Sequence, residues 1–201
     1  MKHLPCLIAS ALLTCAGVGI AQAGSHCETF AGKLTLMPLA NCDKFQQIKR
    51  VERIFEDAVF LYDYEPPEGV DPPPPPLCFE GMISGSLGQR QVTATSLSAL
   101  TVNAFAPPLK VGHAVQLFTA ASVVTISSAA ETGKKAKELG SIFLRDMGVN
   151  FFPPGEWVVP YSSSEQLIGV GGTREFARAS VSLQIEGNEF AGANVFGTVC
   201  R

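Results

Sequence analysis

The stretch Ser180-Val-Ser-Leu-Gln-Ile-Glu186 alternates polar and apolar side chains without a break. A period of two is typical of a β-strand that has one face in a core and the other in water. The side chains expected to point inward are Val181, Leu183 and Ile185. Gly187-Asn188 follows as a two-residue turn, since Gly and Asn tolerate positive φ, and residues 189–200 are expected to form the last strand.

Similar strand-like runs fill the chain upstream of this stretch, as far as Leu77. They are rich in Val, Thr and Ser, and they lie at residues 77–87, 91–105, 114–128, 139–152, 165–171 and 176–186. Such runs with short turns predict seven or eight antiparallel strands. Closing this sheet into a barrel removes the exposed edges that otherwise promote aggregation. The sequence therefore predicts a mainly β protein whose barrel domain spans residues 77–201.

One segment within the barrel region carries a family resemblance. Ile168-Gly-Val-Gly-Gly-Thr-Arg-Glu-Phe-Ala-Arg-Ala179 resembles the strand–turn–strand signature of dirigent and allene oxide cyclase-like barrels. The matching residues are Gly171, Gly172, Thr173, Phe176 and Ala179. Two glycines allow the chain to turn or bulge, Thr173 can hydrogen-bond the turned backbone, and Phe176 can anchor the return strand.

The resemblance implies an eight-stranded barrel of the calycin or allene oxide cyclase-like kind. The chain departs from the family pattern at Arg174, where glycine is usual, and at Ser180, where another glycine is common. Family members include a cyclase, proteins that steer radical coupling and many secreted bacterial proteins. Because one fold hosts many functions, the resemblance bears on the barrel more than on an activity.

The region before the barrel is predicted to be a separate arm. Within residues 24–64 the side chains of Phe45, Ile48, Val51, Phe55 and Val59 recur at helical spacing, and Asp43 can cap this helix. Residues 65–76 end in five consecutive prolines, which favour an extended polyproline linker. A proline motif bound by another protein is the alternative interpretation.

The first 23 residues read as a cleavable signal peptide. Lys2 is followed by the uncharged stretch 4–20 and by Ala21-Gln22-Ala23, whose small side chains suit signal peptidase. A lipoprotein signal acylated at Cys15 is the alternative. We expect a secreted or periplasmic product that is not held in a membrane. Without Lys2, 14 of the 15 Lys and Arg residues remain against 18 acids, so the charge is −4 and nucleic acid is not an expected partner.

Four cysteines remain after residues 1–23: Cys27, Cys42, Cys78 and Cys200. An even number in an exported chain favours two disulfides, and four cysteines allow three pairings. We expect Cys78–Cys200, because closure of the barrel brings its first and last strands together, and Cys27–Cys42 within the arm. No two of these cysteines are spaced like metal ligands, so neither a metal nor a cofactor is expected.

Candidate binding residues come from charges on otherwise apolar strands. Arg145 lies between Phe143 and Met147 on one face of strand 139–152, so it is a candidate anchor for a carboxylate ligand in an apolar lumen. Glu80 is a second, weaker candidate. In the alternative interpretation this face points outward, or Arg145 pairs with a glutamate such as Glu80. No nucleophile motif is present, so catalytic residues remain unknown; His113 is a candidate base only by its residue type.

Three function classes remain open at this point. The favoured hypothesis is a secreted, disulfide-bonded barrel that binds a small apolar or amphipathic ligand, or a protein partner. The first alternative is an isomerase or cyclase of the allene oxide cyclase type. The second is a structural or interaction protein whose lumen is filled by its own side chains. The sequence leans away from an enzyme and does not address the oligomeric state.

Overall fold

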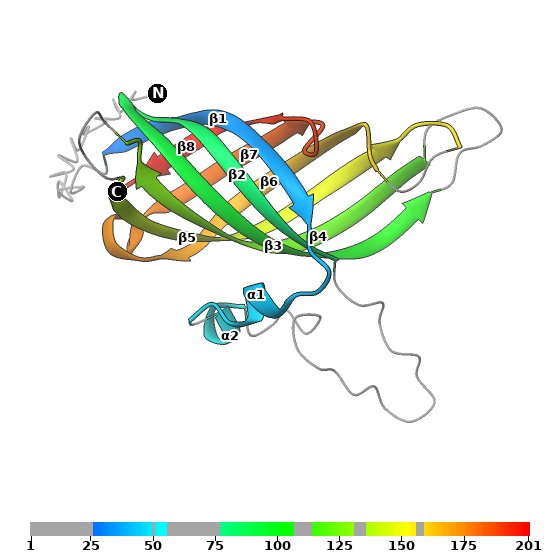
Figure 1. Ribbon diagram of the computed structural model, residues 1–201, viewed down its shortest axis with the longest axis horizontal. Coiled ribbons are helices and arrows are strands. Elements are labelled where there is room, and N and C mark those ends of the chain that lie inside the picture. Colours follow the sequence, from blue (N-terminus) through cyan, green and yellow to red (C-terminus); the bar gives the residue numbers. More distant parts are fainter. Residues whose placement is uncertain (1–25, 50, 56–76, 107–113, 131–135, 156–158) are drawn as a thin grey trace, which may run out of the picture.

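Eight antiparallel strands close into a barrel in the order of the sequence (Figure 1). The structure, a computed structural model, describes residues 26–49, 51–55, 77–106, 114–130, 136–155 and 159–201. The strands are β1 (Cys27–Pro38), β2 (Leu77–Leu87), β3 (Arg90–Ala106), β4 (Ala114–Ser128), β5 (Glu138–Phe152), β6 (Ser162–Gly172), β7 (Ser180–Gly187) and β8 (Ala193–Cys200). The mainly β class and the eight-stranded antiparallel barrel are thus confirmed, and strands β2 to β7 match six of the predicted runs.

The first strand, β1, lies where the sequence predicted an arm outside the barrel. The expectation that residues 24–64 precede the barrel is wrong for Cys27–Pro38, which pairs with β2 on one side and with β8 on the other. Only Phe30 and Leu34 of β1 are buried, at 1% and 3% exposure. Gly32 sits between them, where a Cβ would lie 2.8 Å from the Ser84 carbonyl oxygen of β2. Because glycine stands here in place of an apolar residue, the alternation typical of a β-strand is not recognisable in this part of the sequence.

The disulfide pairing also differs from the prediction. Cys27 is bonded to Cys200 and Cys42 to Cys78, so the expected pairs Cys78–Cys200 and Cys27–Cys42 are wrong. The physical reason is that β8 closes the barrel against β1 instead of β2, which places Cys27 opposite Cys200. A disulfide does join the neighbouring first and last strands of the barrel, but the first strand is β1 and not β2.

One end of the barrel is filled with side chains. Its core includes Phe30 of β1, Leu87 of β2, Phe176 of the turn between β6 and β7, and Val199 of β8. All four are at most 1% exposed. Ion pairs cover this end: Glu28 bonds Arg201, and Glu175 lies 2.7 Å from Arg201 and 3.2 Å from Arg90. Packing and charge pairs thus close the barrel where β1 begins and β8 ends.

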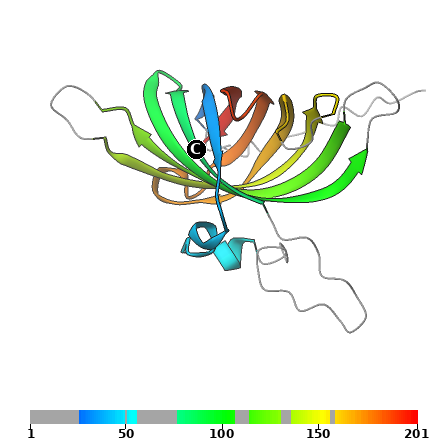
Figure 2. The ribbon, with the colours of Figure 1, turned by 45° about the vertical axis from the view of Figure 1, so that its right-hand side comes forward.

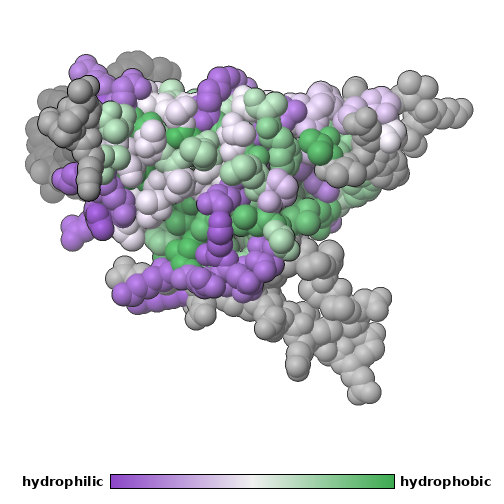
Figure 3. Space-filling view, viewed as in Figure 1, coloured by the Kyte–Doolittle hydropathy of each residue, from purple (hydrophilic) through white to green (hydrophobic). Residues whose placement is uncertain are grey.

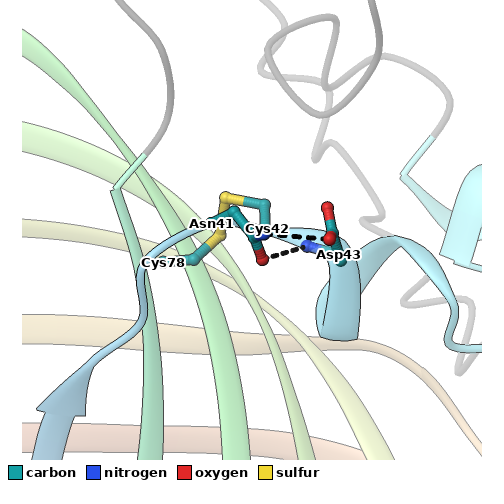
Figure 4. Close-up of a disulfide and its surroundings, with 4 residues drawn as sticks. All are labelled: Asn41, Cys42, Asp43 and Cys78. Carbon is teal, nitrogen blue, oxygen red and sulfur yellow. Dashed lines mark hydrogen bonds between the residues drawn. A yellow bond between two sulfur atoms is a disulfide. The ribbon is translucent and has the colours of Figure 1, made fainter.

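Two short helices cover part of the outer wall (Figure 2). They are α1 (Asp43–Gln46) and α2 (Val51–Ile54), so the single predicted helix is interrupted after Gln46. The N-cap of α1 is Cys42, and the prediction that Asp43 caps the helix is wrong. Figure 3 shows hydrophobic residues gathered where this segment meets the strands. The buried residues of this outer cluster are Phe45, Val51, Phe55, Cys78, Ala99, Ala121, Val123 and Phe143. The Cys42–Cys78 disulfide ties the start of α1 to β2, and Asn41 and Asp43 are hydrogen-bonded beside it at 2.9 Å (Figure 4).

The glycine-rich turn after β6 has the buried Phe176 that its sequence predicted, but the Thr173 hydroxyl bonds the backbone of β5 and not that of its own turn. The Thr173 Oγ1 accepts a hydrogen bond from the Ser141 N–H (2.9 Å), and Phe176 is fully buried. A short 3₁₀ turn, Arg174–Phe176, leads toward β7. Arg174 is the only non-glycine residue with positive φ (51°) among the described residues. Position 174 therefore has a left-handed backbone conformation, which favours glycine.

The predicted signal peptide (residues 1–23), the proline-rich linker (65–76) and His113 lie outside the described residues.

We predict that the disulfide between β1 and β8 is the more stabilising of the two. It joins residues 173 apart in sequence, against 36 for Cys42–Cys78, so the chain-entropy model gives about 5 and about 4 kcal/mol respectively. Cys27→Ser/Cys200→Ser and Cys42→Ser/Cys78→Ser should lower the unfolding free energy in that order in urea titrations. Non-reducing peptide mapping that links Cys78 to Cys200 would contradict the pairing.

We predict that Arg174→Gly is more stable than Arg174→Ala by about 1 kcal/mol. Both variants remove the exposed ion pair with Glu138 (3.6 Å), but only glycine relieves the positive φ. Thermal unfolding of the two variants isolates the backbone effect. Equal stability of the glycine and alanine variants would show that this turn relaxes without strain.

Candidate functional site

A cavity of about 490 Å³ occupies the end of the barrel opposite the packed core. The cavity lies where β1 ends and β8 begins, and residues near strand ends, such as Leu77 of β2 and Phe152 of β5, contribute to its wall. Leu39, after β1, and Phe190, before β8, add further apolar lining. The lumen is therefore closed by packing at one end and hollow at the other.

Four neighbouring strands supply a purely apolar side of the cavity. These are β7, β8, β1 and β2, which adjoin one another in the closed sheet. Their inward side chains at mid-barrel are Leu34, Leu36, Ile83, Leu183, Ile185 and Val195. This confirms the inward placement predicted for Leu183 and Ile185 and provides a surface for the apolar part of a ligand.

The opposite side of the cavity, formed by β3 to β6, carries the polar groups. Its polar lining residues are Ser96, Ser98, Gln116, Ser122, Asp146, Asn150, Ser163 and Glu165. Glu189 joins them from the connection between β7 and β8. Three carboxyl groups thus line one cavity, and no Lys, Arg or His is among the described residues that line it.

Glu189 reaches the cavity because the last turn is longer than predicted. β8 begins at Ala193, not at residue 189, so Glu189 belongs to the turn. The Asn188 Oδ1 accepts hydrogen bonds from the N–H groups of Phe190 (2.9 Å) and Ala191 (3.1 Å). The Leu36 N–H donates to the Glu189 carbonyl oxygen at 2.8 Å, which fixes this turn against β1.

Asp146 belongs to a chain of three polar side chains on adjacent strands. The Ser122 hydroxyl donates to the Asp146 Oδ2, and Ser122 and Ser98 are hydrogen-bonded to each other at 2.8 Å. Asp146 is only 5% exposed, and its Oδ1 has no hydrogen-bond partner within the described part of the chain. The Ser96 Oγ is likewise buried and unpartnered there. Both atoms belong to residues of the cavity wall, where buried polar groups normally have partners.

The other two carboxyls belong to a second chain of polar groups. The Asn150 Nδ2 donates to the Gln116 Oε1 (2.9 Å), and the Ser163 Oγ donates to the Asn150 Oδ1 (2.7 Å). Glu189 is hydrogen-bonded to Ser163 and to Glu165. Because two adjacent carboxylates repel each other, the contact between Glu165 and Glu189 favours a protonated form of the pair.

Burial raises the pKa of all three carboxyls. Burial is the main cause of the raised pKa of Asp146, and the negative charge of Glu189 adds to the shift. The Ser122 hydrogen bond and the charge of Arg145 oppose it, and the resulting pKa is about 7. The pKa of Glu165 lies well above its usual range, through burial and then the negative charges of Glu189 and Asp146. Burial also raises the pKa of Glu189, and its hydrogen bonds with Ser163 and Glu165 oppose this shift. Carboxyls with such pKa values in a cavity are typical of functional sites.

Arg145 is not in the lumen, so the prediction that it anchors a carboxylate there is wrong. Its guanidinium lies over the ring of Phe55, 4.9 Å from the centroid, on the outer wall beside α2. Strand alternation decides this placement, because Leu144 and Asp146 point inward and Arg145 must then point outward. The apolar character of the outward face comes partly from Phe143, which the outer cluster covers.

Glu80 is also on the outer wall and does not contribute to the cavity. Its carboxylate pairs with Lys44 of α1 at 2.6 Å. Of the two alternatives named for Arg145, the outward-pointing face is confirmed, whereas Glu80 pairs with Lys44. The predicted pair Arg145 and Glu80 is not brought together into a site.

The three cavity carboxyls were missed because each looks ordinary in sequence. Asp146 alternates in phase with Ile142, Leu144 and Phe152, but Gly148 and Asn150 share that face, so the odd-numbered face of β5 looks the more apolar in sequence. Glu165 and Glu189 carry no signal, because Glu165 follows three serines and Glu189 lies in an apparent turn. Only closure of the barrel brings the three together.

Searches for similar proteins found no match among protein-family models, curated proteins or solved structures. No helix among the described residues is long and apolar enough to span a membrane. Within the same residues, no three His, Cys, Asp or Glu side chains are grouped as metal ligands. The cavity and its carboxyls are therefore the features from which a function can be argued.

We predict that Asp146 makes the protein less stable as the pH rises from about 4 to 8. Its folded-state pKa of about 7 exceeds the unfolded value of 3.8, so folding binds a proton and stability is highest below pH ~4. The difference corresponds to roughly 4 kcal/mol once the pH exceeds the folded pKa. Asp146→Asn should remove this part of the pH dependence in urea titrations.

Glu186→Gln is the matched control, because Glu186 is exposed on the outer face of β7 and its loss changes the net charge equally. The control should keep the pH dependence of the wild type. If Asp146→Asn and Glu186→Gln follow the same curve between pH 4 and 8, Asp146 is not the group responsible.

Proposed function

We propose that the protein binds a small amphipathic molecule in the barrel lumen. The observation that carries this proposal is the cavity of about 490 Å³, which has an apolar side on β7, β8, β1 and β2 and a polar side on β3 to β6. Pockets for small ligands usually measure about 300–1,000 Å³ and combine apolar lining with a few polar groups. The cavity fits this description in size and in the division of its walls.

The hollow lumen favours binding over a purely structural role. A structural barrel gains stability by filling its interior, as the packed end does with Phe30, Leu87 and Phe176. The other end instead leaves buried carboxyls and two unpartnered oxygen atoms around a cavity. Such an arrangement reduces stability, and proteins commonly retain it where a ligand is bound.

We further propose that this binding takes place outside the cytoplasm and that the chain is a distant relative of the dirigent and allene oxide cyclase-like barrels. Two disulfides in a chain that begins with a signal-like sequence support export. The closed eight-stranded barrel and the turn at Thr173–Phe176 are compatible with the relationship.

The uncharged fluorescent probe N-phenyl-1-naphthylamine tests the binding function. It should bind the wild type with a rise in fluorescence, because the lumen offers apolar surface shielded from water. Ala120→Trp should weaken this binding at least tenfold, since Ala120 of β4 lines the cavity and the indole would fill it. Retained unfolding cooperativity confirms that the variant is folded.

Leu117→Trp is the matched control on the same strand. Leu117 is 51% exposed on the outer wall, so its replacement leaves the lumen unchanged and the probe affinity should stay within twofold of the wild type. A wild type that does not bind the probe, or equal loss in both variants, would refute binding in the lumen.

A further inference from the structure

We propose that the ligand of this cavity is an amine, whose ammonium group binds between Asp146 and the Glu165–Glu189 pair while its apolar body lies against β7, β8, β1 and β2. The inference rests on the proposed binding function and names its ligand class. It reverses the sign of charge expected from the sequence, which pointed to a carboxylate ligand at Arg145. Four features of the cavity support an amine ligand.

The first feature is the pair of unpartnered oxygen atoms. The Asp146 Oδ1 and the Ser96 Oγ are buried without hydrogen-bond partners among the described residues, and each residue is only 5% exposed. Both can accept a hydrogen bond from a ligand. An ammonium group has three N–H donors and no acceptor, so it complements the Oδ1 of ionised Asp146 and has further donors for the Glu165–Glu189 pair. A carboxylate ligand offers no donor to ionised Asp146, whereas the Ser96 hydroxyl can either donate or accept.

The second feature is the charge of the lining. Asp146, Glu165 and Glu189 are acidic, and the described lining contains no cationic side chain. Binding an anion here would add to the repulsion among the carboxyls, whereas a cation would relieve it. The nearest cation in sequence, Arg145, lies on the other side of the β5 backbone, over Phe55.

The third feature is the anchoring of the carboxyls. The Oδ2 of Asp146 is held by Ser122, which is itself bonded to Ser98, and Glu189 is held by Ser163. For Asp146 this bond leaves the Oδ1 without a partner among the described residues, and in both groups the bonds orient the carboxyl. An ion pair formed with such oriented and buried groups loses little side-chain entropy.

The fourth feature is the apolar side, which selects an organic cation. Leu34, Ile83, Leu183 and Val195 cannot replace the hydration shell of an inorganic ion, but they favour contact with a hydrocarbon body. The combination of an acidic group and a hydrocarbon surface in one cavity matches an amphipathic amine.

Binding should depend on pH because the ammonium pairs best with ionised Asp146. The groups that face Asp146 are Ser122 and Glu189, with Glu165 nearby and Arg145 behind it. Occupancy by a cation favours the ionised form, so an amine should release protons when it binds near pH 6–7. Its affinity should rise as the pH increases through the pKa of Asp146, about 7.

The test compares octylamine, octanol and octanoate, which share one chain and differ in the headgroup. Each is titrated at pH 8 against the bound naphthylamine probe, and octylamine stays protonated there because an alkyl amine resembles Lys, with pKa ~10.4. Octylamine should displace the probe at a concentration at least tenfold lower than octanol, and octanoate should be the weakest. Calorimetry of octylamine at pH 6.5 in two buffers of different ionisation enthalpy should show proton release.

Asp146→Asn is the decisive variant, because it keeps the shape of the side chain and removes the charge. It should reduce the octylamine affinity at least tenfold, leave that of octanol within twofold and abolish the proton release. Glu186→Gln, on the outer wall, should change none of these values.

The outcomes separate this inference from the function on which it rests. If neither the probe nor octanol binds the wild type, the proposed binding function fails. If the probe and octanol bind but octylamine shows no advantage, or Asp146→Asn retains that advantage, the amine inference is overturned and binding of an apolar ligand stands.

Discussion

The hydrogen-bonded pairing of β1 with β8 is the constraint on which the rest of the structure depends. It runs from Cys27 opposite Cys200 to Leu34 opposite Ala193 and turns an open sheet of eight strands into a barrel. A covalent bond at Cys27–Cys200 and the ion pair between Glu28 and Arg201 secure the same two strands. Without this pairing the inward faces would have no common interior, because an open sheet has two edges and no lumen.

Closure also creates the chemical environment of the cavity. Asp146, Glu165 and Glu189 come from two strands and a turn, and in an open sheet water would reach each of them. Inside the barrel they lose solvent, which raises the pKa of each carboxyl, and the charge of Glu189 raises the pKa values of Asp146 and Glu165 further. The serines and Asn150 hold these groups in two hydrogen-bonded chains, so the polar side of the lumen is ordered before any ligand arrives.

The outer wall has its own packing, and this explains why inside and outside were confused on β5. The outer cluster, centred on Phe45 and Phe55, covers Ala99, Ala121 and Phe143 on the outer faces of β3, β4 and β5. These strands are therefore apolar on both faces, and apolar character no longer indicates the lumen. Arg145 lies at the margin of this cluster, over Phe55, where its charge remains outside the barrel. Met147, 67% exposed, continues the same outward face into solvent.

The sequence by itself determined the class of the fold and most of the strands, because alternation along β7 and the runs from Leu77 onward are local properties of the chain. It also identified the turn at Thr173–Phe176, because the glycine-rich segment before this turn is a local feature of the chain. Only the tertiary structure decided the role of Cys27–Pro38, the disulfide partners and the side of the sheet on which Arg145 lies. The candidate site belongs to this second group: Asp146, Glu165 and Glu189 are separated in sequence by up to 43 positions, and no local pattern joins them. Their common location follows from the register of paired strands and from closure, which are long-range interactions that a reading of neighbouring residues does not contain.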